Sequence, residues 1–168
     1  MTSFAVPRLH RVRPARAGGT PEPIYPDVLG VLRHQHGRML RLCAEVDAAR
    51  GEAKARRFAA LGRLITLHEL GDRTVVHPAT RDSGALGDAV GRACTAEEIG
   101  IELAVADLAR LGAGHASFDA RFAQLCRALL EHTAHEERDE FPLLRLASPR
   151  RLGQLAGEVH DVQIIGAA

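Results

Sequence analysis

Two stretches of the chain carry a histidine, an acid four residues later and a proline six residues beyond the acid. The first, LHELGDRTVVHP, contains His68 and Asp72, and the second, EHTAHEERDEFP, contains His132 and Glu136. Residues four apart lie on one face of a helix, so each pair presents a nitrogen donor beside an oxygen donor. Imidazoles and carboxylates together suit first-row transition metals. Each pair therefore predicts one half of a metal site.

The two pairs belong to a longer internal repeat. The segment RFAALGRLITLHELGDRTVVHP, from Arg57, aligns without gaps with RFAQLCRALLEHTAHEERDEFP, from Arg121. A core-facing helix explains the matched leucines and phenylalanines, but not a matched histidine and acid. Two surface pairs, each contributing about 0.3 kcal/mol, are the alternative. Surface pairing would explain one His–acid pair by itself. Two such pairs at matched positions of the repeat favour a metal site instead.

The helix around HQHGRML is expected to supply a further nitrogen donor. His36 shares a helix face with Leu32 and Met39, which makes it a better candidate than His34. A lone histidine on such a face would equally fit a core residue. The candidate donors on the other predicted helices favour the interpretation of His36 as a metal ligand.

The segment from about residue 95 to residue 111 has no histidine in its periodic part, but it contains Glu97, Glu98 and Glu102. Glu98 shares its face with Ile101 and is the preferred donor. Glu102, one turn further on, is the second choice, and Glu97 is expected to face solvent. This helix therefore offers an oxygen donor.

Apolar residues recur at three- and four-residue spacing along most of the chain, which predicts an all-α protein. We expect an up-down-up-down four-helix bundle with a flexible N-terminal arm and a short C-terminal helix. Pro78 and Pro142 are expected to end the regular parts of two helices. The predicted helices span about 26–50, 52–77, 95–111 and 117–140, with a short one starting near Ser148 and Pro149. The predicted parts are a Pro/Arg-rich arm (1–24), the bundle (25–146) and a short helix with a tail (147–168).

Composition predicts a soluble, cytoplasmic protein without nucleic-acid or membrane partners. The chain has 22 Lys and Arg against 21 Asp and Glu, so its net charge does not indicate an anionic partner. No run of about 18 apolar residues occurs, and the N-terminal segment lacks the apolar core of a signal peptide. The 3 cysteines form no CxxC pair, which fits a reducing compartment.

Over about Val28 to Leu146 the chain resembles the hemerythrin-like family, also called the HHE cation-binding domain. The resemblance is carried by the histidine of QHGRML, by HELGD with the following HP, by the AEE opening of the third helix, and by EHTAHEERDEFP. It implies a four-helix bundle that holds two iron ions in a non-haem di-iron centre. Such a centre binds or reacts with dioxygen, peroxide or nitric oxide, or binds iron itself.

Carried over by position, the resemblance implies a carboxylate-rich ligand set. Asp72 stands where the family pattern usually has Glu, and Glu98 stands where many relatives have His. Hard oxygen donors favour the ferric state, so we expect slow-returning oxidation rather than reversible oxygen carriage. Manganese or zinc would also suit mixed ligands. The implied ligands are His36, His68, Glu69, Asp72, Glu98, His132 and Glu136.

Three functions remain open from the sequence. The first is a binding or sensing protein. The second is a di-iron oxidoreductase, which either removes peroxide or nitric oxide or oxidises a small organic substrate. The third is a helical bundle that binds no metal. No residue is assigned a catalytic role, and no protein partner is indicated. His77 is expected to pack at a helix end on the side opposite His68, and His135 to face solvent, with orientation of a ligand as the alternative.

Overall fold

A computed structural model describes residues 25–167, and within this range every secondary-structure element is a helix. The prediction of an all-α chain is thereby confirmed for this part, while the predicted arm (1–24) lies outside the described residues. None of the helices described is long and apolar enough to cross a membrane. The elements are α1 (Val28–Ala48), α2 (Gly51–Gly71), the π-helical turn η1 (Asp72–Val76), α3 (His77–Arg81), α4 (Ala85–Leu111), α5 (Phe118–His135), the π-helical turn η2 (Glu136–Glu140), α6 (Phe141–Leu144) and α7 (Pro149–Gly166).

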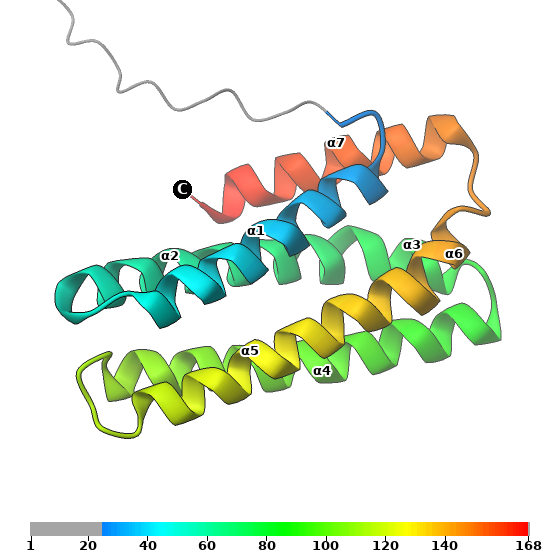
Figure 1. The fold of residues 1–168 in the computed structure, drawn as a ribbon. Helices are drawn as coiled ribbons and strands as arrows, with labels where there is room; N and C mark the ends of the chain where they lie inside the picture. Colours follow the sequence, from blue (N-terminus) through cyan, green and yellow to red (C-terminus); the bar gives the residue numbers. More distant parts are fainter. Residues whose placement is uncertain (1–24, 168) are drawn as a thin grey trace, which may run out of the picture.

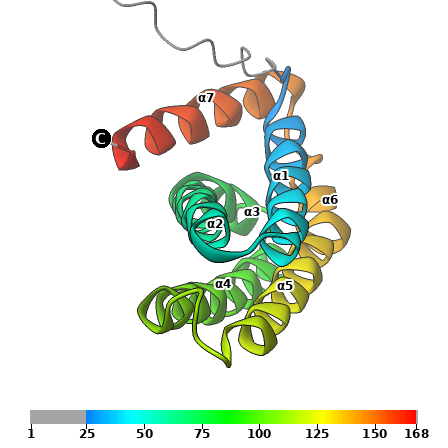
Figure 2. The ribbon, with the colours of Figure 1, turned by 60° about the vertical axis from the view of Figure 1, so that its left-hand side comes forward.

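The four long helices α1, α2, α4 and α5 lie side by side and run in alternating directions (Figure 1). Helix α1 contacts α2 and α5, and α4 contacts α5 and α2. The tight reversal from α1 into α2 uses Gly51, whose φ of 55° is readily adopted only by glycine. Seen from the side in Figure 2, α7 packs across α1 and α2.

Two apolar clusters fill the interior. Cluster one lies toward the connections from α1 to α2 and from α4 to α5, and it includes Phe58, Phe118 and Phe122. Cluster two lies toward the opposite end and includes Leu32, Phe141 and Leu155. On three of the long helices a histidine separates the clusters: His36 lies between Leu32 and Met39, His68 between Ile65 and Val75, and His132 between Leu129 and Phe141. Polar side chains therefore form a layer between two apolar layers.

The prolines widen helices rather than ending them. A proline ring collides with the carbonyl four residues back and has no N–H to donate. Just before Pro78, the N–H of His77 donates to the carbonyl of Asp72, five residues back, and Phe141 donates to Glu136 in the same way before Pro142. The chain then continues as α3 and α6. The predicted helix ends at these prolines are wrong.

Helix α4 begins at Ala85, about ten residues before the predicted start near residue 95, and its first part is rich in glycine. Its glycines serve close packing against α3. A side-chain carbon at Gly87 would collide with the carbonyl oxygen of Thr80, and one at Gly91 would lie 3.3 Å from Nε of Arg81. The glycines therefore mark a helix contact and not a loop.

The C-terminal helix is not short, as predicted, but spans 18 residues. The Ser148 hydroxyl accepts a hydrogen bond from the N–H of Arg151 and caps its start. Leu152, Leu155 and Val159 are buried in cluster two. Helix α7 is therefore part of the core.

This packing predicts that Leu155→Ala destabilises the protein by about 2–5 kcal/mol, because the side chain is completely buried and a cavity would remain. Ile165→Ala on the same helix should change the stability by less than about 0.5 kcal/mol, since Ile165 is 75% exposed. Urea unfolding of the two variants checks this. Equal, small effects would show that α7 does not unfold together with the bundle.

Candidate metal centre

The structure brings all seven predicted donors together in the polar layer between the two apolar clusters. None is more than 2% exposed. They come from α1, α2, η1, α4, α5 and η2, so segments distant in sequence meet here. The seven are His36, His68, Glu69, Asp72, Glu98, His132 and Glu136.

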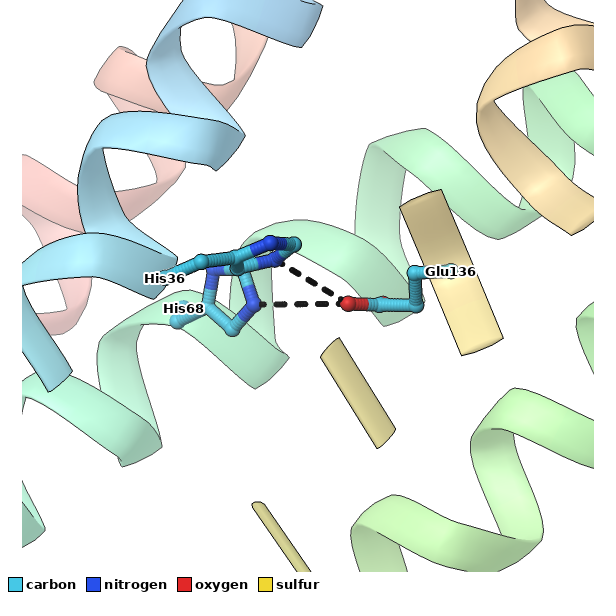
Figure 3. Close-up of side chains that lie close together, drawn as sticks. All are labelled: His36, His68 and Glu136. Carbon is cyan, nitrogen blue, oxygen red and sulfur yellow. Dashed lines mark ion pairs between the residues drawn. The ribbon is translucent and has the colours of Figure 1, made fainter. Parts of the chain in front are cut away.

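One group of donors forms around one oxygen of Glu136 (Figure 3). Nε2 of His36 lies 3.1 Å from Oε2 of Glu136, and Nε2 of His68 lies 3.9 Å from the same oxygen. Nε2 of His68 is also 3.1 Å from Oδ2 of Asp72. Two imidazoles from α1 and α2 thus converge on a carboxylate from η2.

A second group lies on the other side of Glu136. Its Oε1 is 3.5 Å from Nε2 of His132. Donor atoms of His77, Glu98 and Glu136 lie within 4.8 Å of one another, as do those of His36, His68 and Glu136. Glu136 belongs to both groups, which is the position of a carboxylate able to bridge two cations.

The donor atoms facing this space lack hydrogen-bond partners. Burying such groups unpaired costs several kcal/mol each, about 2–7 kcal/mol for a neutral polar group. A cation placed among them would satisfy the lone pairs, so the residues present fit a metal. The unpartnered atoms are Nε2 of His36, His68 and His132, both carboxylate oxygens of Glu69 and Asp72, and Oε2 of Glu136 and Glu140.

The outer nitrogens of the three predicted histidine donors are all engaged. Nδ1 lies 2.9 Å from Oε1 of Glu137 in His36, 2.9 Å from Oε1 of Gln35 in His68, and 2.9 Å from Oε2 of Glu97 in His132. Acceptors at these distances keep a proton on Nδ1, so that Nε2 is the nitrogen directed inward and the one that a metal would bind in place of a proton. The surroundings therefore prepare three imidazoles for metal binding.

Two of these acceptors are themselves held. Gln35 donates to Oε1 of Gln163 on α7 at 3.0 Å, which fixes the orientation of its amide. Glu97, expected to face solvent, is 41% exposed at its side chain but also accepts from His132 and His135. His135, whose side chain is only 19% exposed, thus helps to position a ligand through Glu97. This corresponds to the orienting alternative for His135 rather than to the solvent-facing one.

Two further buried groups, His77 and Glu140, are not among the predicted donors. Nε2 of His77 lies 2.6 Å from Oε1 of Glu98, and Nδ1 lies 2.7 Å from Oε1 of Glu140. The Thr80 hydroxyl also donates to this oxygen, at 2.7 Å. The expectation that His77 faces away from His68 is wrong, because the π-helical turn η1 lies between them. The following Pro78 was the one signal in the sequence of a distorted turn.

Arg73 lies at the rim beside Glu102, the second-choice donor. Nη2 of Arg73 is 2.7 Å from Oε1 of Glu102, and Nη1 is 3.4 Å from Oε2 of Glu98. The side chain of Glu102 is 36% exposed, whereas Glu98 is fully buried. Of these two carboxylates, Glu98 is therefore the one that belongs to the buried layer.

The charges of the layer shift its pKa values in opposite directions. Burial and the nearby carboxylates raise the pKa of Glu69 to about 9, and burial raises the pKa of Asp72 well above its usual range. Burial alone would raise the pKa of Glu136 too, but the imidazoles around it hold that pKa well below its usual range. Burial alone would lower the pKa of His77, but its bonds to Glu140 and Glu98 raise it to about 11.

The comparison with known families identifies the class of protein that has this fold and site. The profile of the hemerythrin HHE cation binding domain matches residues 27–144. The chain belongs to this family, as the resemblance predicted, and membership indicates a metal-binding protein, typically one that binds iron. Neither a curated protein nor a solved structure gives a significant match to the chain.

The shifted pKa of Glu69 predicts how the stability of the metal-free protein depends on pH. The folded state holds a proton on Glu69 between pH 4.5 and about 9 that the unfolded state releases, so stability falls as pH rises through this interval. In excess chelator, Glu69→Gln should reduce that fall by at least about 1.4 kcal/mol, the equivalent of one pKa unit. Urea unfolding at several pH values measures it. Glu131→Gln, an exposed carboxylate on α5, is the control and should leave the slope unchanged.

Proposed function

We propose that the chain is an up-down-up-down four-helix bundle that holds a non-haem di-iron centre for a small oxidising ligand, either dioxygen, peroxide or nitric oxide. The observation that carries the proposal is the layer of buried donor atoms without partners, which come from α1, α2 and α5 and from the turns η1 and η2, with the buried Glu98 of α4 beside them. A metal-free function for such a layer would leave its desolvation cost without compensation.

The proposed ligands are the seven residues predicted from the sequence. His36, His68 and Asp72 would hold one ion, and Glu69, Glu98 and His132 the other, with Glu136 between them. Asp72 has a shorter arm than the glutamate usual in the family, but its Oδ2 lies 3.1 Å from the inward nitrogen of His68, which supports its reach. Four carboxylates would balance the charge of two divalent cations.

Bound iron would supply the electrons for reduction of an oxidant, or a binding position for nitric oxide. The surrounding residues would hold the imidazoles in orientation and exclude bulk water, because every proposed ligand is at most 2% exposed. Iron is favoured by family membership, while the donor set itself also suits manganese or zinc.

Two surface hollows formed by the described residues lie away from the proposed ligands, which supports a small ligand over an organic substrate. A groove of about 640 Å³ between α2 and α4 is lined by small and apolar residues such as Gly62, Val105 and Ala109, and it contains none of the proposed ligands. A second hollow, of about 260 Å³, lies beside α7 and reaches Gln35 but again no proposed ligand. Diatomic molecules and peroxide are small enough to reach the buried layer without a hollow of this size next to it.

Metal loading tests the proposal. After anaerobic addition of ferrous ion and removal of the excess, elemental analysis should find two iron ions per chain. His68→Ala should lower this number, whereas His160→Ala, at an exposed histidine on α7, should not. At a free iron concentration of about 100 times Kd, the loaded protein should gain about 2.7 kcal/mol of stability. A wild-type chain that binds neither iron, manganese nor zinc would remove the proposal.

The abundance of carboxylates predicts how the loaded protein responds to oxygen. Oxygen donors stabilise the ferric state, so exposure of the ferrous protein to oxygen should produce an absorption spectrum that persists after degassing and returns only with a reductant. A spectrum that reverts on degassing would instead indicate reversible oxygen carriage. Steady-state consumption of peroxide or nitric oxide by the same sample would distinguish an enzyme from a sensor.

A further inference from the structure

We propose that His77 is itself a metal ligand, through Nε2, and that it provides the second ion with the nitrogen donor that α4 lacks. The inference rests on the proposed function and extends its ligand set. It also assigns Glu140 as the positioning residue that holds His77. Neither residue is matched by the histidine and acid pattern of the sequence.

The orientation of His77 follows the same scheme as that of the three predicted histidine donors. In His36, His68 and His132, Nδ1 meets an oxygen acceptor on the outer side and Nε2 faces the interior of the layer. In His77, Nδ1 meets Oε1 of Glu140 at 2.7 Å, and Nε2 points toward Glu98. All four imidazoles are therefore held through Nδ1 by an oxygen on the outer side, but Nε2 of His77 already has Glu98 as its partner, whereas the other three Nε2 atoms have none. Only His77 comes from the segment after a π-helical turn.

His77 lies beside the group of donors that has fewer imidazoles. Without His77, the first group has two imidazoles, His36 and His68, and the second has only His132. Donor atoms of His77, Glu98 and Glu136 lie within 4.8 Å of one another, and all three residues are buried. Inclusion of His77 gives each ion two imidazoles and keeps Glu136 between the ions.

The short contact between His77 and Glu98 is compatible with ligation. Nε2 of His77 and Oε1 of Glu98 are 2.6 Å apart and share one proton. An ion that binds between them takes the place of this proton, which is released to solvent, and both atoms then donate electron pairs to the metal. No bond other than N–H or O–H is broken, and nothing is oxidised.

Glu140 holds His77 from the outer side. Its Oε1 accepts from Nδ1 of His77 and from the hydroxyl of Thr80, both at 2.7 Å, and the residue is fully buried. Two donors on one oxygen fix the carboxylate, which in turn fixes the ring and keeps the proton on Nδ1. Removal of such an outer partner typically weakens metal binding by about 10- to 100-fold.

The test loads the ¹⁵N-labelled full chain with Zn²⁺, which is diamagnetic, and measures both stoichiometry and the imidazole nitrogens by long-range ¹⁵N–¹H NMR. In the wild type, Nε2 of His77 should take the chemical shift of a metal-bound nitrogen while Nδ1 keeps its proton. His77→Ala should bind one ion instead of two, and the matched control His160→Ala should bind two. Circular dichroism and thermal unfolding without metal establish that each variant is folded, and His77→Gln replaces His77→Ala if the smaller side chain prevents folding.

Glu140→Gln separates positioning from overall structure. The first ion should bind with unchanged affinity, and the second about 10- to 100-fold more weakly. Equal weakening of both ions would overturn the positioning role, as would no weakening.

The outcomes distinguish the two proposals. A wild type that takes up fewer than two iron ions in the ferrous loading experiment contradicts the proposed di-iron function. A wild type with two ions and a folded His77 variant that retains both, or loses both, overturns the inference about His77 alone. Retention of protons on both nitrogens of His77 in the loaded protein overturns it as well.

Discussion

Burial of acids and imidazoles in the middle of an apolar interior is the constraint on which the rest of this structure depends. At each end of the polar layer, a cluster of leucine, valine and phenylalanine side chains supplies favourable burial, while the layer itself opposes folding until its lone pairs are satisfied. The neutralising groups within the structure are few: imidazoles face Glu136, and Arg73 reaches the carboxylates only from the rim. A bound cation would satisfy the layer from within.

The internal repeat explains how one helical element produces two different halves of the site. The π-helical turns η1 and η2 occupy matching positions in the two copies, each before a proline. At the end of each turn, one of two adjacent residues is apolar and the other is polar, and the order of the two is reversed between the copies. In the first copy, apolar Val76 precedes His77, and in the second, Glu140 precedes apolar Phe141. His77 and Glu140 meet across the molecule, so the two copies complement one another instead of duplicating the same donors.

Much of this arrangement could be predicted from the sequence, because helical periodicity places a residue on a face without knowledge of its neighbours. The all-α class follows from that periodicity, as does the burial of His36, Glu98 and both His–acid pairs. Periodicity does not single out Glu69, which only the resemblance predicts as a ligand and which the structure buries beside the other donors. What could not be predicted depends on departures from the ideal helix or on packing between distant segments. The position of His77 requires the wider turn before Pro78, and the early start of α4 requires knowledge that Gly87 packs on α3.

The hydrogen bond between Gln35 and Gln163 spans 128 residues of sequence. A contact between such distant segments closes a long loop of chain, which costs conformational entropy. His68 therefore obtains its final orientation only when α7 has docked and Gln163 holds the amide of Gln35. The arrangement of the donor side chains is thereby a property of the completed native state. A chain that is still folding has no preformed site at which an ion could bind and hold it in a partly folded form.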